Sequence, residues 1–339
     1  MAYKKIKIAN LLSEFAASEN ASDNVAQNAN LRAFKVLMNA LGVSMSEAQR
    51  FIDKGRLFCN GEVVSAKNEI LRGEIELISY ENAPRGQKPI FDNQNFAVFD
   101  KQSGILSHPN GRNCAYSLCD EIWHLYGAQA GVAHRLDRET SGLILVAKDK
   151  KTQTIFKTLF EKRLVKKEYL ALVSGQTPLE FSVDLPMNSA CDEVKTRMRL
   201  CPLSEGGKEA RTEFKRLCYF SEQDLLNLSR EIQLGKGFDF SKGASLLLAR
   251  PLTGRQHQIR LHLFASGFAI LGEPLYGLEK ADIERILDKQ MSAFERVSLT
   301  GATRLCLHSN RLAFEFGGKS YDILSQRDIR AEFLRALSL

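Results

Sequence analysis

The sequence predicts an α+β protein, in which a mixed, mainly antiparallel sheet with flanking helices is preceded by a small domain. Its 339 residues are 44% hydrophobic and 26% charged, an average composition for a globular chain that excludes wholesale disorder. In the larger part of the chain, apolar runs of strand length outnumber segments with helical spacing. A stretch with Pro84 and Gly86 and no apolar pattern divides this part from the residues before it.

Residues 1–30 are expected to form a flexible N-terminal arm, because residues 17–30 are rich in Asn, Ser and Ala and show little apolar periodicity. The basic start of the chain is followed by an apolar stretch that Glu14 interrupts, which argues against a secretory signal. No apolar run approaches the roughly 18 residues that cross a bilayer. We therefore expect a cytoplasmic protein.

Residues 31–80 are expected to form the small domain. Apolar residues at helical spacing predict one helix that ends near Gly42 and a second that ends near Lys54. The Asn60–Gly61 pair then predicts a hairpin turn between two strands, and a further strand closes the domain.

Residues 81–88 are the expected linker, and residues 89–339 the large domain. Residues 221–244 look like a long excursion between its strands. The predicted strands cover residues 96–100, 142–148, 168–175, 245–251 and 312–317, and the predicted helices cover residues 152–163, 256–265 and 281–294.

The charge of the chain favours a polyanionic partner. Lys and Arg number 47 against 40 for Asp and Glu, a net charge of +7. Residues 148–168 carry eight Lys or Arg against three Asp or Glu, a composition that attracts phosphates. A solvated helix face accounts for the same charges equally well.

The densest polar cluster, residues 131–148, places an acid among cations directly before an apolar strand. Because that strand must lie inside the sheet, the loop before it is pinned at a sheet edge or cleft, which suits a catalytic group. Arg135 and Arg138 favour the ionised form of Asp137 and lower its pKa, so Asp137 suits a nucleophile or base better than a proton donor. A salt-bridged surface loop is the alternative interpretation.

A second cluster, residues 249–267, contains a turn followed by a predicted helix. Arg255 and Arg260 are five residues apart and so lie on different sides of that helix, which predicts different roles. His257 and His262 miss the spacing of a zinc-binding H-E-x-x-H helix, so structural histidines are preferred.

The sequence lacks the motifs that are typical of several other kinds of active site. The seven cysteines form no C-x-x-C pair and no metal-ligand spacing. The phosphate-binding loop, the dinucleotide fingerprint, the serine nucleophile elbow and the zinc-deaminase pattern are also missing from the sequence. What remains is cofactor-free chemistry at a carboxylate, on a polyanionic substrate.

Residues 134–142, HRLDRETSG, resemble the H-R-L-D-x-x-T-S-G catalytic loop of the RluA-type RNA pseudouridine synthases. Further motifs of that family appear in the same order: residues 96–109 resemble its first motif, residues 165–175 the motif with the active-site tyrosine, and residues 253–277 its T-G-R-x-H-Q-[IL]-R block. Residues 31–80 are similar to the alpha-L RNA-binding module that often precedes this catalytic domain.

The resemblance implies that a uridine within RNA is isomerised to pseudouridine by cleavage and re-formation of its glycosidic bond, without a metal or organic cofactor. Asp137 would be the essential carboxylate, either as nucleophile or as base. Tyr169 would stack on the base and assist proton transfer, and Arg260 would pair with Asp137 and keep it ionised. Arg135 would fill the space left by the flipped uridine, whose extrusion costs about a few kcal/mol.

The resemblance assigns further contacts with RNA. Those in the catalytic domain are Lys101, His134, Arg138, Thr140, Arg255 and His257. In the small domain, charge and helical spacing predict a shared surface for phosphate contact made of Arg32, Lys35, Arg50, Lys54 and Arg56. The chain departs from the family pattern in three places, where Gln102, Gln256 and Glu273 replace Pro, Thr or Ser, and Asp. None of the three removes a catalytic position.

Large-subunit ribosomal RNA is the expected substrate and transfer RNA the alternative, with a monomer as the expected state. An alternative of another class is an RNA-binding or ribosome assembly factor that keeps the fold but has no activity. A glycosidase would need a second acid opposite Asp137, and neither Glu139 nor Asp149 has a motif that places it there.

Overall fold

The computed structural model describes residues 3–8, 31–80, 82–109, 115–190, 197–231 and 238–338. They divide into two compact units, Met1–Ala83 with Asn110–Tyr116, and Pro84–Pro109 with Ser117–Leu339. Most of the expected arm, residues 9–30, lies outside the described ranges. Within those ranges, every helix is too short or too polar to cross a lipid bilayer.

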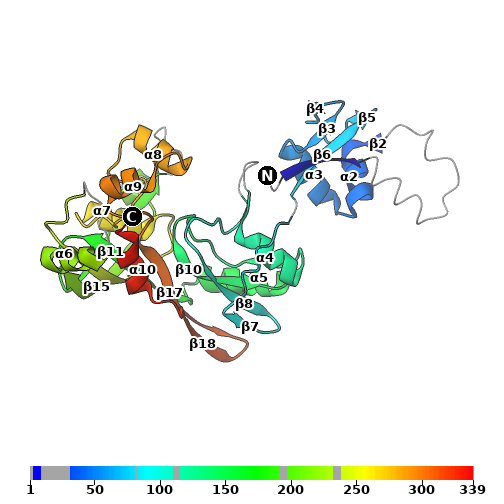
Figure 1. Ribbon diagram of the computed structural model, residues 1–339. Coiled ribbons are helices and arrows are strands. Elements are labelled where there is room, and N and C mark those ends of the chain that lie inside the picture. The colour runs from blue at the N-terminus through cyan, green and yellow to red at the C-terminus, as the bar shows by residue number, and fades with distance from the viewer. Residues whose placement is uncertain are drawn as a thin grey trace. The chain divides into compact units, whose positions relative to one another are not determined.

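The small unit combines two helices with short strands (Figure 1). Four strands form an antiparallel sheet in the order β1 (Tyr3–Lys7), β6 (Ile75–Tyr80), β3 (Leu57–Cys59) and β4 (Glu62–Val63). A separate pair joins β2 (Leu31–Arg32) to β5 (Ile70–Leu71), and the helices are α2 (Ala33–Leu41) and α3 (Met45–Asp53).

The predicted helix end at Gly42 and the predicted hairpin turn at Asn60–Gly61 are confirmed. Gly42 ends α2 in the left-handed conformation, with φ of 62°. Ser44 caps α3 and forms a capping box with Glu47. Asn60 and Gly61 have φ of 50° and 84°, the left-handed pair that a tight hairpin between β3 and β4 requires.

The expectation that the arm begins at the first residue is wrong, because residues 3–7 are a strand paired with β6. The alternation of Lys and Ile around Ile6 gives this strand one apolar side, and Ile8 is completely buried in the core of the small unit. Lys5 bonds Glu76 at 2.6 Å and Lys7 pairs with Glu74, so the other side is held by ion pairs.

The large unit contains a ten-stranded mixed sheet. Its main order is β12 (Glu180–Asp184), β15 (Arg211–Phe220), β16 (Ala244–Pro251), β11 (Lys166–Ser174), β17 (Leu307–Phe316), β10 (Ser141–Ala147), β8 (Phe96–Lys101) and β7 (Phe91–Asp92). Outside that path, β18 (Lys319–Leu324) pairs with β17 and β9 (Gly131–Val132) with β10. Among the pairings between named strands of the described ranges, β10 with β17 alone is parallel.

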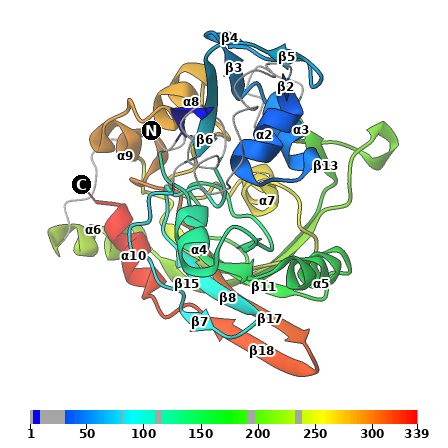
Figure 2. The ribbon, with the colours of Figure 1, turned by 90° about the vertical axis from the view of Figure 1, so that its right-hand side faces the viewer.

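Helices flank this sheet, and the β17–β18 hairpin projects at one end of it (Figure 2). The helices are α4 (Leu118–Tyr126), α5 (Lys150–Glu161), α6 (Glu222–Glu231), α7 (Gln258–Ala265), α8 (Lys280–Leu287), α9 (Ala293–Thr300) and α10 (Ile329–Ala336). A short extra hairpin joins β13 (Met187–Ser189) to β14 (Met198–Leu200).

The predicted central strands are confirmed, and alternation along them explains their continuous apolar runs. In β10, Ile144 and Val146 pack into one buried cluster while Leu143 and Leu145 pack into another. Both faces of this part of the sheet are therefore covered, which an unbroken apolar run predicts. The fold class is α+β with a mixed sheet, as expected.

Two segments differ in detail from the prediction. Residues 281–294 give parts of two helices rather than one, because Lys289 has φ of 59° and Ser292 caps α9 through a capping box. The excursion at residues 221–244 contains α6, and its residues 232–237 lie outside the described ranges.

Candidate active site

Asp137 lies in the loop between β9 and β10, and its neighbours hold that loop to the sheet. Leu136 is 7% exposed, and its backbone N–H and carbonyl both bond the Ser107 hydroxyl, at 3.2 and 2.9 Å. At the other end of the loop, a Cβ on Gly142 would lie 2.3 Å from the Ser309 carbonyl oxygen. Glycine is therefore required where β10 approaches β17, and the loop is pinned on both sides.

Arg260 on α7 connects two carboxylates. Its Nη1 donates to Asp137 Oδ2 at 2.9 Å, while its Nε and Nη2 donate to Glu273 at 2.8 and 2.6 Å. Arg260 and Glu273 are almost completely buried, with 3% and 4% of their side chains exposed, whereas Asp137 keeps 28%. The exposed end of this chain of ion pairs is thus the carboxylate of Asp137.

The sequence does not predict the role of Glu273 in the site. In the sequence, Glu273 is only a departure from the family's usual Asp at that position. It also accepts hydrogen bonds from the backbone N–H groups of Leu275 and Tyr276, at 3.0 and 3.4 Å. The acidic residue type within the matched block was the available signal, but only the fold shows that it faces Arg260.

His257 completes the surroundings of Asp137. Its Nε2 lies 3.7 Å from Asp137 Oδ2, and its Nδ1 lies 3.2 Å from the hydroxyl of Tyr276. The residue has φ of 54° in the turn before α7, and it is buried. Burial and the charge of Arg260 lower the pKa of His257 to about 4, so the imidazole is neutral at physiological pH.

The pKa of Asp137 lies below its ordinary value. Burial opposes ionisation, but the positive charges of His257, when protonated, and Arg260, with the hydrogen bond from Arg260, outweigh it. Asp137 is consequently a carboxylate at neutral pH and available as a nucleophile or base.

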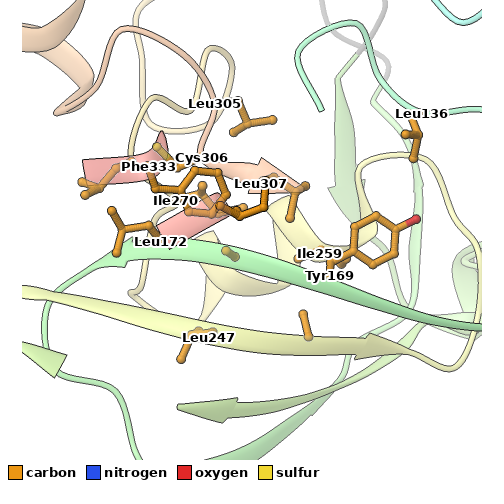
Figure 3. Packing of buried hydrophobic residues seen from close by; sticks show 14 of the residues in the cluster. Leu136, Tyr169, Leu172, Leu247, Ile259, Ile270, Leu305, Cys306, Leu307 and Phe333 are labelled. Carbon is orange, nitrogen blue, oxygen red and sulfur yellow. The ribbon is translucent and has the colours of Figure 1, made fainter. Parts of the chain in front are cut away.

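Tyr169 projects from β11 and is 9% exposed. Figure 3 shows its ring beside Ile259, with the hydroxyl directed to the side on which Leu136 lies. Burial and the charge of Asp137 raise the pKa of Tyr169 to about 12, so the phenol keeps its proton at neutral pH. The site therefore offers an ionised carboxylate and a neutral phenol.

The structure contradicts the expectation that Lys101 contacts the substrate. Its side chain is completely buried, and its ammonium donates to the carbonyl oxygens of Gln102, Ile105 and Arg138 at 3.0, 2.8 and 3.1 Å. Burial lowers its pKa to about 7. Lys101 ties the loop after β8 to the backbone beside Asp137, and it presents no group at the surface.

His134 is half-buried and engaged with the protein, and Thr140 is buried. The Nε2 of His134 accepts the Leu145 backbone N–H at 3.1 Å, and its ring lies 4.9 Å from that of Phe160. Burial and the charge of Lys167 lower its pKa to about 3, so it stays neutral. Thr140 is 3% exposed. The packing of the loop against β10 accounts for both placements.

The remaining basic residues differ in their exposure and in their hydrogen bonds. Arg135 is exposed, while Arg138 donates to the Leu287 carbonyl at 3.0 Å and so reaches the end of α8. Arg255 is half-buried and its Nε donates to the Glu209 carbonyl at 3.0 Å. In the small unit, Arg32, Lys35, Arg50 and Lys54 are exposed and Arg56 is half-buried.

Comparison with known proteins identifies the family. The model of RNA pseudouridylate synthase matches residues 95–265, half of the chain. An "Uncharacterized RNA pseudouridine synthase" of Helicobacter pylori is 34% identical over 91% of this chain and 94% of its own length. A "Ribosomal large subunit pseudouridine synthase D" of Nitrosomonas europaea is 30% identical over 70% of this chain and 66% of its own length.

The fold is similar to that of "Human RNA Pseudouridylate Synthase Domain Containing 1", a solved structure with 20% identity and a TM-score of 0.52. The match covers 71% of this chain and 83% of the human chain. The matched family segment contains Asp137, Tyr169 and Arg260. The chain belongs to the RNA pseudouridylate synthase family.

Proposed function

We propose that this RNA isomerase converts uridine to pseudouridine in large-subunit ribosomal RNA, with Asp137 as the reacting carboxylate. The observation that carries the proposal is the partly exposed carboxylate of Asp137, which Arg260 holds at 2.9 Å while Glu273 fixes Arg260. A carboxylate fixed in this way is ionised and preorganised, and needs no further reorganisation to react.

The reaction needs only groups that these residues supply. The bond from the sugar C1′ to the uracil N1 breaks, the uracil turns, and its C5 forms the new bond to C1′. The C5 proton then leaves and N1 gains one, so the atoms balance without a second substrate. Asp137 attacks the sugar or accepts a proton from it, and the neutral phenol of Tyr169 lies beside it to exchange a proton with the base.

Cations near the loop support RNA as the substrate. Lys167 donates to the Thr253 carbonyl at 3.2 Å, and Arg163 lies 3.4 Å from the Glu209 carboxylate. Arg255 donates to the carbonyl of that same Glu209, so Arg163 and Arg255 both lie beside Glu209, and Arg135 is exposed on the catalytic loop. We infer that these residues bind phosphates next to the target uridine and make binding salt-dependent.

We further propose that the small unit is an RNA-binding module, since four of its five expected contact residues are exposed. The choice of ribosomal RNA is supported by the name of the relative from Nitrosomonas europaea. Transfer RNA is the alternative substrate, and an RNA-binding assembly factor without activity is the alternative function.

The test is release of tritium from RNA labelled at C5 of uridine, taken from cells that lack the gene and separated into ribosomal and transfer RNA. Each turnover sends one C5 hydrogen to water. We expect release from the ribosomal fraction by the parent protein and none by Asp137→Asn, whose circular dichroism should match the parent. Release from transfer RNA alone would correct the substrate. No release from either fraction, with RNA binding intact, would favour the assembly factor.

A further inference from the structure

Ser309 carries a hydroxyl that is buried beside the site and that the proposed mechanism does not use. The residue lies on β17 and is completely buried, and its Oγ has no hydrogen-bond partner within the described parts of the chain. Buried hydroxyls almost always have a partner, because water can no longer satisfy them. An unpaired one next to an active site therefore calls for a functional explanation.

The sheet places Ser309 between the two elements that carry the reacting groups. On one side it is the parallel partner of Gly142, which ends the Asp137 loop. On the other side it is the antiparallel partner of Tyr169. Residues directly opposite on neighbouring strands share a face of the sheet, with Cβ atoms about 5 Å apart. The Ser309 hydroxyl and the Tyr169 ring therefore lie on the same face.

The preceding position on that face is apolar. Two residues before Ser309, Leu307 packs against Ala171, its partner on β11, in the main buried cluster. A small apolar residue would fill the position of Ser309 equally well for stability. Burial and the charge of Asp137 raise the pKa of Tyr169, whereas the Ser309 side chain lowers it, which is the direction expected of a hydrogen bond to the phenol oxygen.

We propose that Ser309 is a positioning residue for Tyr169, whose phenol oxygen accepts a hydrogen bond from the Ser309 hydroxyl. This inference rests on the proposed function. This hydrogen bond would satisfy the otherwise unpaired Oγ of Ser309. The phenol oxygen is then occupied on the sheet side, so the phenol's own proton points away from β17 toward the substrate.

The variant Ser309→Ala tests this, with Ser245→Ala as the matched control. Ser245 is also a completely buried serine of the same sheet, but its hydroxyl donates to the Gly175 carbonyl at 2.7 Å and accepts the Thr177 N–H at 3.2 Å. We expect Ser309→Ala to lower kcat about fivefold to tenfold, the effect of one hydrogen bond, with KM within twofold and an unchanged or raised melting temperature. We expect Ser245→Ala to have a lower melting temperature than the parent protein and the same kcat.

A double-mutant cycle with Tyr169→Phe localises the effect. If Ser309 acts through the phenol, Ser309→Ala should not slow Tyr169→Phe any further, because the accepting oxygen is already gone. A readout independent of turnover is the ¹³Cζ chemical shift of Tyr169, which should move in Ser309→Ala and stay in place in Ser245→Ala.

The inference requires that Ser309→Ala lowers kcat through Tyr169 and that it shifts the Tyr169 resonance. A parental kcat in Ser309→Ala, an equal slowing in the Tyr169→Phe background, or an unmoved Tyr169 resonance would each overturn it. Failure of the proposed function is distinguishable, since the parent protein would then release no tritium from any RNA, while the resonance would still report whether the two hydroxyls interact.

Discussion

Arg260 divides its three hydrogen-bonding nitrogens between Glu273, which receives two bonds, and Asp137, which receives one. The bidentate pair fixes the plane of the guanidinium, so the third nitrogen reaches Asp137 at a set angle and distance. Glu273 thereby controls the carboxylate of Asp137 without touching it.

The first prediction concerns Glu273→Gln. The amide retains the shape but removes the charge and one acceptor oxygen, so Arg260 turns toward Asp137 and loses its fixed plane. We expect kcat to fall at least tenfold with RNA affinity within a few fold, measured by tritium release and filter binding. Glu273→Asp keeps the charge, so its kcat should fall less than that of Glu273→Gln. Equal activity of Glu273→Gln and the parent would show that Arg260 does not need this support.

A second prediction follows from the buried histidines. The pKa of His134 is lowered to about 3 in the folded protein, against about 6.5 in the unfolded chain. Between these values the unfolded chain binds the proton and the folded protein does not, so stability is lost as the pH falls below 6.5. The contribution is about 1.4 kcal/mol per pH unit.

The variant His134→Gln keeps an acceptor for the Leu145 N–H but cannot titrate. We expect its free energy of unfolding, from urea titrations between pH 6 and 4, to fall less steeply than that of the parent by about 1.4 kcal/mol per unit. Parallel slopes in the two proteins would mean that His134 is protonated in the folded state.

The third prediction concerns Lys101→Met. The substitution leaves three carbonyls without their donor and frees the loop after β8 from the backbone of Arg138. We expect the free energy of unfolding to fall by about 3 kcal/mol and kcat to fall with it. Lys150→Met, at an exposed position on α5, is the control and should leave both unchanged. A Lys101→Met protein as stable as the parent would rule out this anchoring role.

Removal of the small unit gives the fourth prediction. A chain that starts at residue 85 lacks the exposed cations of α2 and α3 and their surroundings, while the ten-stranded sheet keeps all its strands. We expect about tenfold weaker RNA binding with a shallower salt dependence, and a melting temperature within a few degrees of the parent. Early melting of the shortened protein would show that the sheet depends on the small unit.

The sequence predicts Asp137, Tyr169 and Arg260 as catalytic residues because they lie in long motifs, and the fold brings Arg260 to Asp137 as expected. It did not place Glu273 against Arg260, because that contact joins residues on either side of a turn after α7. Lys101 was expected to contact the substrate because it lies in the first family motif. Its burial depends on carbonyls from two loops, which only the folded backbone brings together.

The most direct test of the account compares tritium release from C5-labelled ribosomal RNA by the parent protein and by Asp137→Asn. We predict stoichiometric release by the parent and none by the variant at equal RNA binding. Equal release by the two proteins would contradict the assignment of Asp137 as the reacting carboxylate.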